Sequence, residues 1–193
     1  MKRIVKLIIL LALFVQTDFA QTVTTEKEYK LVYDSLVSRL TLAEKDANDC
    51  VGQPFSKFIK LLDKYGMKIT QLGGLRYDSG KLYPQEVFGI SLVFTDDECY
   101  NFVWTHDLQQ PYVYIYFNES KPYEDAERLI RKHKSHFTEE MEAFYSDAVI
   151  KSIDFYFMDD MYSILYKTKK EKKEKAEKEK KEKETENKKI KIR

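Results

Sequence analysis

The chain has 193 residues and is close to neutral, with 33 lysine and arginine residues against 32 aspartate and glutamate residues. The charge is unevenly distributed: residues 167–193 carry 14 basic and 7 acidic side chains, whereas residues 21–166 carry 16 basic and 24 acidic ones. An acidic body repels phosphate backbones, so we expect no nucleic acid to bind it. We expect residues 21–166 to form a single domain, because this length suffices to bury one core.

Residues 1–20 have the three-part plan of a secretory signal peptide: a basic start, an apolar run over residues 7–15, and a short polar stretch that ends at Ala20. The apolar run is well below the ~20 residues that a membrane-spanning helix needs, which disfavours a signal anchor. We therefore expect cleavage after Ala20 and a periplasmic or secreted chain without a transmembrane segment.

Two helices are expected at the start of the body. Thr25 and Glu28 fit a capping box, in which each side chain binds a free backbone N–H group at the start of a helix. The residues that follow at the spacing of one helical face are Tyr29, Val32, Tyr33, Leu36, Val37 and Leu40. Core packing is the favoured interpretation of this face, and binding of a partner is the alternative.

The second helix is predicted after Gly52 and Pro54, since proline is tolerated in a first helical turn. Gly66 is placed to close this helix in the left-handed conformation. The stretch that begins at Val51 and ends at Gly66 resembles the glycine-led short helix that opens the helix-then-sheet units of the β-lactamase-inhibitor-protein-like fold, which includes small envelope-assembly lipoproteins. The resemblance implies an envelope-assembly or inhibitor-like module. The lipid-anchor cysteine of those lipoproteins has no counterpart after the apolar run.

Alternating side chains predict an antiparallel sheet. Residues 67–72 are expected to form a first strand that Gly73 and Gly74 close, and a turn is expected at residues 78–81. Residues 87–95 are predicted to form a strand whose apolar face carries Phe88, Ile90, Leu92 and Phe94. Residues 149–158 are expected to form the last strand.

The aromatic stretch at residues 100–117 is predicted to form two strands joined by a turn at residues 107–110. A turn that sets Trp104 opposite Val113 directs one set of side chains to the core side. That set contains Tyr100, Phe102, Trp104, Val113, Ile115 and Phe117. The other side then carries a row of tyrosines, with Tyr156 on the outward side of the last strand.

We take Tyr112, Tyr114, Tyr116 and Tyr156 as the candidate binding residues. Tyrosine presents a flat apolar body and a polar tip, so such a ladder can stack sugar rings or accept a peptide. The alternative interpretation is that the tyrosines cover a half-exposed sheet or lie beneath a helix.

A helical insertion is expected before the last strand. Pro122 precedes a first helix with acidic residues in its first turns, where the helix dipole favours them, and Thr138 precedes a second helix. The predicted fold class is therefore α+β, with an antiparallel sheet of four or more strands, N-terminal helices and a helical insertion before the last strand.

Few residues suggest chemistry. His133 and His136 are spaced to approach one metal ion with Glu139 or Glu140, but their neighbours are basic and disfavour a cation. His106 and Asp107 are a possible acid and base pair, but no nucleophile accompanies them. We therefore assign no catalytic residue, metal ligand or cofactor.

Cys50 and Cys99 are the only cysteines, and an exported chain favours a disulfide between them. A redox role lacks a Cys-x-x-Cys spacing. Residues 167–193 form a charged tail that we expect to be disordered or a solvated helix, since glutamate precedes lysine by four residues at several positions. The tail is a solubilising element or a contact for anionic surfaces.

The favoured function is that of an exported, non-enzymatic protein that binds a protein or glycan partner through an aromatic sheet face. The first alternative is an envelope-assembly or inhibitor-like module. The second is a hydrolase or metal-dependent enzyme that uses His106 or the pair His133 and His136.

Overall fold

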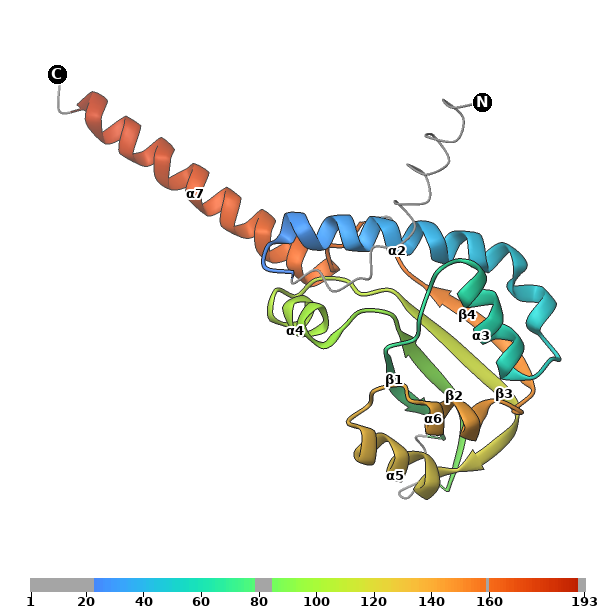
Figure 1. The fold of residues 1–193 in the computed structure, drawn as a ribbon. Coiled ribbons are helices and arrows are strands. Elements are labelled where there is room, and N and C mark those ends of the chain that lie inside the picture. The colour runs from blue at the N-terminus through green and yellow to red at the C-terminus, as the bar shows by residue number, and fades with distance from the viewer. Residues whose placement is uncertain (1–22, 79–84, 159, 191–193) are drawn as a thin grey trace, which may run out of the picture.

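The computed structural model describes residues 23–78, 85–158 and 160–190 (Figure 1). The expected signal peptide and most of the expected turn at residues 78–81 lie outside the described residues. Within them, four strands form one antiparallel sheet in the order β1-β2-β3-β4. The strands are β1 (Gln71–Arg76), β2 (Glu86–Val93), β3 (Tyr112–Pro122) and β4 (Ile150–Tyr156). The predicted α+β class is confirmed, including the N-terminal helices and the helical insertion before the last strand.

The N-terminal helices begin and end as their local sequences predict. Helix α2 (Glu26–Ala47) starts with the capping box: the Thr25 side chain accepts a hydrogen bond from the Glu28 N–H group, and the Glu28 carboxylate accepts one from the Thr25 N–H group. A short 3₁₀ turn, η1 (Asn48–Cys50), leads to α3 (Phe55–Lys64). Gly66 follows α3 at a φ of +64°, the left-handed conformation that favours glycine.

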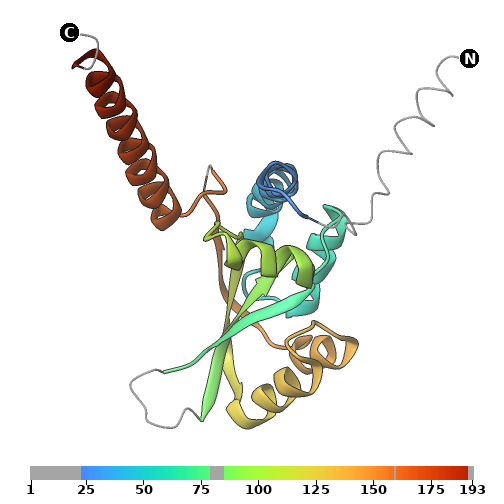
Figure 2. The ribbon, with the colours of Figure 1, turned by 90° about the vertical axis from the view of Figure 1, so that its left-hand side faces the viewer.

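One face of the sheet is covered by helices. Its buried strand residues pack against α2, α3, α5 (Tyr123–His133) and α6 (Glu139–Tyr145). In Figure 2, α5 and α6 lie on one side of the strands, and no helix among the described residues lies opposite them on the other side. The strand residues of this core cluster are Leu72, Val87, Ile90, Leu92, Val113, Ile115, Phe117 and Ile150.

Residues 97–105 form helix α4 (Asp97–Thr105), so the strand predicted over residues 100–105 is wrong. The Asp96 carboxylate caps the helix by accepting a hydrogen bond from the Cys99 N–H group at 2.8 Å. Cys99 and Val103, four residues apart, are the buried residues of α4. Residues 97–99 are therefore the first turn of a helix.

The predicted pairing of residues 100–104 with β3 is consequently wrong. Strand β3 pairs instead with β2 and β4, and Ile115 lies opposite Ile90 on one side and Ile153 on the other. Trp104 was expected in the core, but its side chain is 64 % exposed. Tyr100 and Phe102 are also on α4 and do not face Phe117 and Ile115 across a sheet.

Strand β2 also departs from strict alternation. The register of β2 against β3 shifts between Val87 and Gly89, which reverses the expected orientation at this end of the strand. Val87 is fully buried, whereas Phe88 is 39 % exposed. The expectation that Phe88 shares the apolar face with Ile90 and Leu92 is therefore wrong. Strand β1 likewise runs through Gly73 and Gly74 rather than ending there.

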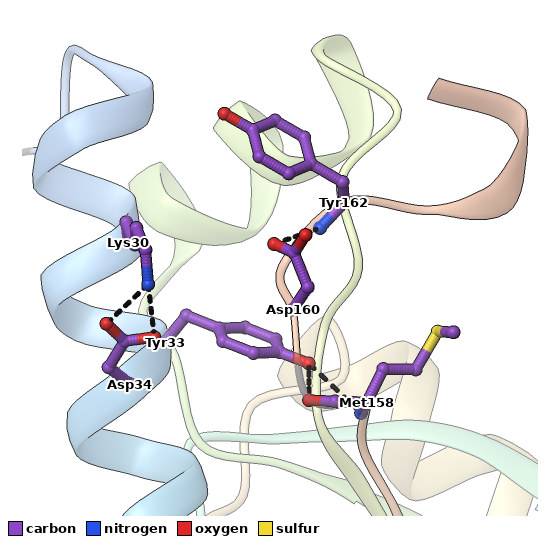
Figure 3. A network of polar contacts seen from close by, with 6 residues as sticks. All are labelled: Lys30, Tyr33, Asp34, Met158, Asp160 and Tyr162. Atoms are coloured by element: carbon purple, nitrogen blue, oxygen red, sulfur yellow. Dashed lines mark hydrogen bonds and ion pairs between the residues drawn. The ribbon is translucent and has the colours of Figure 1, made fainter. Parts of the chain in front are cut away.

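A second apolar cluster joins the N-terminal half of α2 to α4 and to the segment that precedes the last helix. Its buried members are Val23, Tyr29, Tyr33, Cys99, Val103, Leu108 and Met161. Polar contacts reinforce it (Figure 3). The Tyr33 hydroxyl donates to the Met158 carbonyl at 2.8 Å and accepts from the Met158 N–H group at 3.1 Å. The end of β4 is thereby fastened to α2.

The charged tail is helical within the described residues. Helix α7 (Ile164–Ile190) leaves the body beside α2 and α4 (Figure 1). Lys169 pairs with Asp107, and the Lys167 ammonium lies 3.5 Å from the Asp160 carboxylate. Beyond these contacts, side chains at residues 171–178 are exposed. None of the described helices is both long and apolar enough to span a membrane.

Candidate functional site

The four predicted binding tyrosines lie on one face of the sheet. Tyr112, Tyr114 and Tyr116 alternate along β3 with fully or nearly fully buried residues, and Tyr156 lies directly opposite Tyr112 on β4. This surface is turned away from the helices that cover the core, and we call it the open face. It comprises Arg76, Phe88, Gly89, Ser91, Tyr112, Tyr114, Tyr116, Ser152, Asp154 and Tyr156.

The aromatic rings of the open face contact one another. The ring centroids of Tyr112 and Tyr114 are 6.2 Å apart and their planes differ by 13°. Tyr114 and Tyr156 are 6.3 Å apart at 51°, and Phe88 stacks on Tyr116 at 6.3 Å and 14°. Tyr156 is 54 % exposed, whereas the three tyrosines of β3 are half-buried. The rings therefore form two contacting groups on the same face, Tyr112 with Tyr114 and Tyr156, and Phe88 with Tyr116, and both groups are partly open to solvent.

Small residues on β2 make room for these rings. Gly89 pairs with Tyr116, and a Cβ atom at residue 89 would lie 3.1 Å from the Tyr116 ring and 2.6 Å from the Ile115 carbonyl oxygen. Ser91 pairs with Tyr114 and is 4 % exposed. The larger side chains of β1 and β3 therefore lean together over Gly89 and Ser91.

Arg76 is the central cation of the open face. Its guanidinium carbon lies 4.0 Å from the centroid of the Tyr114 ring, a cation–π arrangement. Its Nε atom is buried and has no hydrogen-bond partner among the described residues. Asp154 is exposed and lies on β4, where it is the cross-strand neighbour of Tyr114 on the side away from β1. A cation and an anion thus flank the same ring.

Helix α4 lies near one end of the open face. Burial, followed by the nearby hydroxyls of Tyr100 and Tyr114, raises the pKa of Tyr112 to about 12. Tyr100 also contacts the exposed Trp104, with ring centroids 6.1 Å apart. The aromatic surface therefore extends from the sheet towards α4, and Tyr112 keeps its proton at neutral pH.

Sequence reasoning missed several members of this site. Arg76 was not singled out, because nothing in the sequence predicts which ring an arginine on another strand will meet. Phe88 was placed in the core because the register shift beside it was not foreseen. Gly89 did carry a usable signal, since a glycine inside a strand often marks a close approach of other groups.

The histidines do not assemble a metal site within the described residues. The Nε2 atom of His133 lies 2.7 Å from the Glu140 carboxylate, whereas that of His136 lies 3.3 Å from Asp97 on α4. The Lys132 ammonium also binds Glu140, at 2.5 Å. The two imidazoles therefore engage different carboxylates, and a lysine already occupies one of them.

His106 and Asp107 are not paired with each other in the described structure. The His106 ring stacks on Phe102 with centroids 4.0 Å apart, and its Nδ1 atom lies 2.8 Å from the Phe102 carbonyl oxygen. Asp107 instead binds Lys169 of α7. Both side chains have structural contacts, with no acid and base arrangement between them.

The expected disulfide is not formed, because Cys50 and Cys99 are both free and buried. Cys50 belongs to the core beneath the helices, whereas Cys99 belongs to the second cluster beside α4. The prediction rested on the oxidising compartment expected for an exported chain, which does not determine whether two cysteines lie close together in the fold. Burial raises the pKa of Cys99 to about 12, so its thiol is not a reactive group at neutral pH.

No family model, curated protein or solved structure matches this chain. The likeness of residues 51–66 to β-lactamase-inhibitor-protein-like modules is therefore untested by any relative. The function has to be inferred from the open face and its surroundings.

Proposed function

We propose that this chain is an exported, non-enzymatic interaction protein that binds its partner through the open face. The observation that carries the proposal is the shared position of Tyr112, Tyr114, Tyr116 and Tyr156 on the sheet face opposite the helices. Export follows from the signal peptide expected at residues 1–20, and the compartment is the periplasm or the exterior.

The composition of the open face suits binding better than catalysis. Tyrosine rings bring large rigid contact areas at low entropic cost, and their hydroxyls supply hydrogen bonds at the rim. Exposed Phe88 and Tyr156 lie towards opposite ends of the surface. Phe88 and Tyr156 are exposed and adjoin half-buried tyrosines, so the open face presents several aromatic rings together on one surface.

The enzyme alternative has less support. His106 lies against Phe102, and the pair His133 and His136 is divided between two carboxylates. A hydrolase needs a base within hydrogen-bond reach of a nucleophile, and no such pair is found around these histidines in the described residues.

A binding experiment with immobilised protein tests the proposal. The wild type and the variants Phe88→Ala and Tyr156→Ala are incubated with the native envelope fraction and with a panel of oligosaccharides. Leu31→Ala is the matched control, because Leu31 is 68 % exposed on α2, outside the open face. We expect both open-face variants to lose the wild-type partner and the control to retain it. Retention of every wild-type interaction by a variant with Tyr112, Tyr114 and Tyr116 all changed to alanine would overturn the proposal.

An envelope-assembly or inhibitor-like module is the second candidate. It is supported by the left-handed glycines on both sides of α3, Gly52 at a φ of +75° and Gly66 at +64°, followed by an antiparallel sheet. Enrichment of assembly factors by the wild type, but not by Tyr156→Ala, would favour this reading. Enrichment of glycans alone would exclude it.

The tail supplies a second contact surface. Exposed lysines on α7, including Lys172 and Lys173, suit an anionic surface, which attracts basic residues at a strength of about 1 kcal/mol each. Sedimentation with anionic and with neutral vesicles, for the full chain and a chain ending at residue 166, tests this. Equal sedimentation of both chains would exclude a role for the tail.

A further inference from the structure

We infer that the partner of the open face is a second copy of this chain. Two open faces pack against each other about a two-fold axis, and Arg76 of each copy pairs with Asp154 of the other. The inference rests on the proposed function, which assigns binding to this surface, and goes further by naming the occupant.

The charges of the open face are suited to a second copy. Arg76 lies over Tyr114 from the side of β1, and Asp154 pairs with Tyr114 from the side of β4. In the described part of the chain, neither side chain has an ion pair or a hydrogen bond to another side chain. One surface therefore carries an unpaired cation and an unpaired anion on opposite sides of one ring.

A two-fold axis brings these charges together. Consider an axis that lies in the interface and runs parallel to β3. Rotation by 180° about this axis leaves each residue at the same height along the strands, and it places the β4 edge of one copy over the β1 edge of the other. Asp154, one strand spacing of ~4.8 Å from β3, is thereby placed on the β2 side of the other copy's Tyr114. That is the side from which Arg76 approaches the ring. A two-fold interface repeats each contact, so the dimer gains two such ion pairs.

The remaining surface fits the same arrangement. Face-to-face sheets pack ~10 Å apart, a distance that aromatic side chains from both sheets can fill. The rings of Tyr114 and Tyr156 then bury their exposed edges, and desolvation strengthens each ion pair relative to water. An uncharged glycan can hydrogen-bond to Arg76 and Asp154 but cannot form an ion pair with either, whereas a second copy supplies both opposite charges.

The size of the open face predicts a weak dimer. Four strands at ~4.8 Å span roughly 19 Å, and six residues of β3 extend about 20 Å, so each copy contributes roughly 400 Å². Standard interfaces use about 800 Å² per partner. We therefore expect a reversible, concentration-dependent dimer rather than an obligate one.

Charge reversal and its rescue test this inference. Sedimentation velocity over concentrations from about 10 µM to about 1 mM compares the full wild-type chain with Arg76→Glu, Asp154→Arg and the double variant that exchanges the two charges. Lys60→Glu, an exposed charge reversal on α3, is the control. We expect the wild type and Lys60→Glu to dimerise alike, each single variant to dimerise at least about tenfold more weakly, and the double variant to recover.

Several outcomes would overturn the dimer. These are a monomeric wild type at every concentration, single variants that dimerise as the wild type does, and a double variant no better than the single ones. Asp154 is exposed, so its single variant is informative even if Arg76→Glu alone disturbs the fold. A monomeric wild type whose Tyr156→Ala variant still loses another partner would overturn the dimer and leave the proposed function standing. Dimerisation that is unchanged by the charge variants and by Tyr156→Ala would place the dimer contact on another surface and overturn the inference, while the proposed function would still be judged by the binding experiment.

Discussion

Gly89 lies directly beneath Tyr116: the two residues pair across β2 and β3, and a Cβ atom at residue 89 would come within 3.1 Å of the Tyr116 ring. It would also come within 2.6 Å of the backbone carbonyl of Ile115, which cannot rotate away. Tyr116 can therefore lie against the sheet in this position only because residue 89 has no side chain.

We expect Gly89→Ala to lower the free energy of unfolding by roughly 1–3 kcal/mol, the usual range for overpacking. Urea denaturation followed by circular dichroism measures the change. Gly74→Ala is the control, because its nearest neighbour would be the Ser91 hydroxyl at an ordinary 3.6 Å. Its effect should remain within about 0.5 kcal/mol. Equal stabilities of the two variants would refute this account of the packing.

Trp104, the only tryptophan of the chain, reports on α4. Its side chain is 64 % exposed, so we expect emission typical of a solvated indole and ready quenching by acrylamide. Trp104→Ala should change the free energy of unfolding by no more than about 0.5 kcal/mol. A blue-shifted emission protected from quenching would instead support the buried strand that the sequence suggested.

The failure at α4 has a physical cause. Aromatic and β-branched residues favour strands on average, and residues 100–105 are rich in them. The helix depends on a single cap at Asp96 and on contacts of Cys99 and Val103 with α2, which is distant in sequence. Local propensity was thus overridden by tertiary packing, although an acidic residue before Asp97 and Glu98 was a usable sign of a helix start.

Other elements were predictable because their signals are local. The capping box at Thr25 and the left-handed Gly66 depend only on nearby backbone groups, and both are present. The alternation along residues 112–117 also predicted which side chains of β3 are buried. Arg76 and Asp154 meet Tyr114 through strand pairing, and single-sequence patterns do not specify that register.

The contact between Tyr33 and Met158 should stabilise the end of β4. Tyr33→Phe removes the partner of a backbone N–H group and a carbonyl, so we expect a loss of roughly 1–3 kcal/mol in the free energy of unfolding. Tyr65→Phe is a matched control, because its hydroxyl binds Asp46, whose side chain is 39 % exposed and can bind water instead. Thermal unfolding of both variants provides the comparison. A larger loss for Tyr65→Phe would contradict the assigned role of Tyr33.

Alkaline pH should destabilise the fold, and Tyr112 of the open face should contribute to the loss together with the buried Tyr29 and Tyr145, whose pKa values burial also raises. The pKa of Tyr112 is raised from 10.0 to about 12, chiefly by burial, so the folded state holds this proton more tightly than the unfolded state does. The corresponding stability is complete below pH 10 and is lost as the pH rises towards 12. Urea unfolding at pH 9, 10 and 11 should show the decline, and Tyr112→Phe should show less of it. An identical decline in both proteins would assign the effect to other groups.

Photocrosslinking from the open face tests the central claim most directly. A photoreactive phenylalanine analogue replaces Tyr156 in one sample and Leu31 in another, and each chain is illuminated in the native extract. We predict a defined adduct from residue 156 and none from residue 31, and an adduct of twice the chain mass would identify a second copy as the partner. A defined adduct from residue 31 with none from residue 156 would contradict the claim that the open face binds the partner.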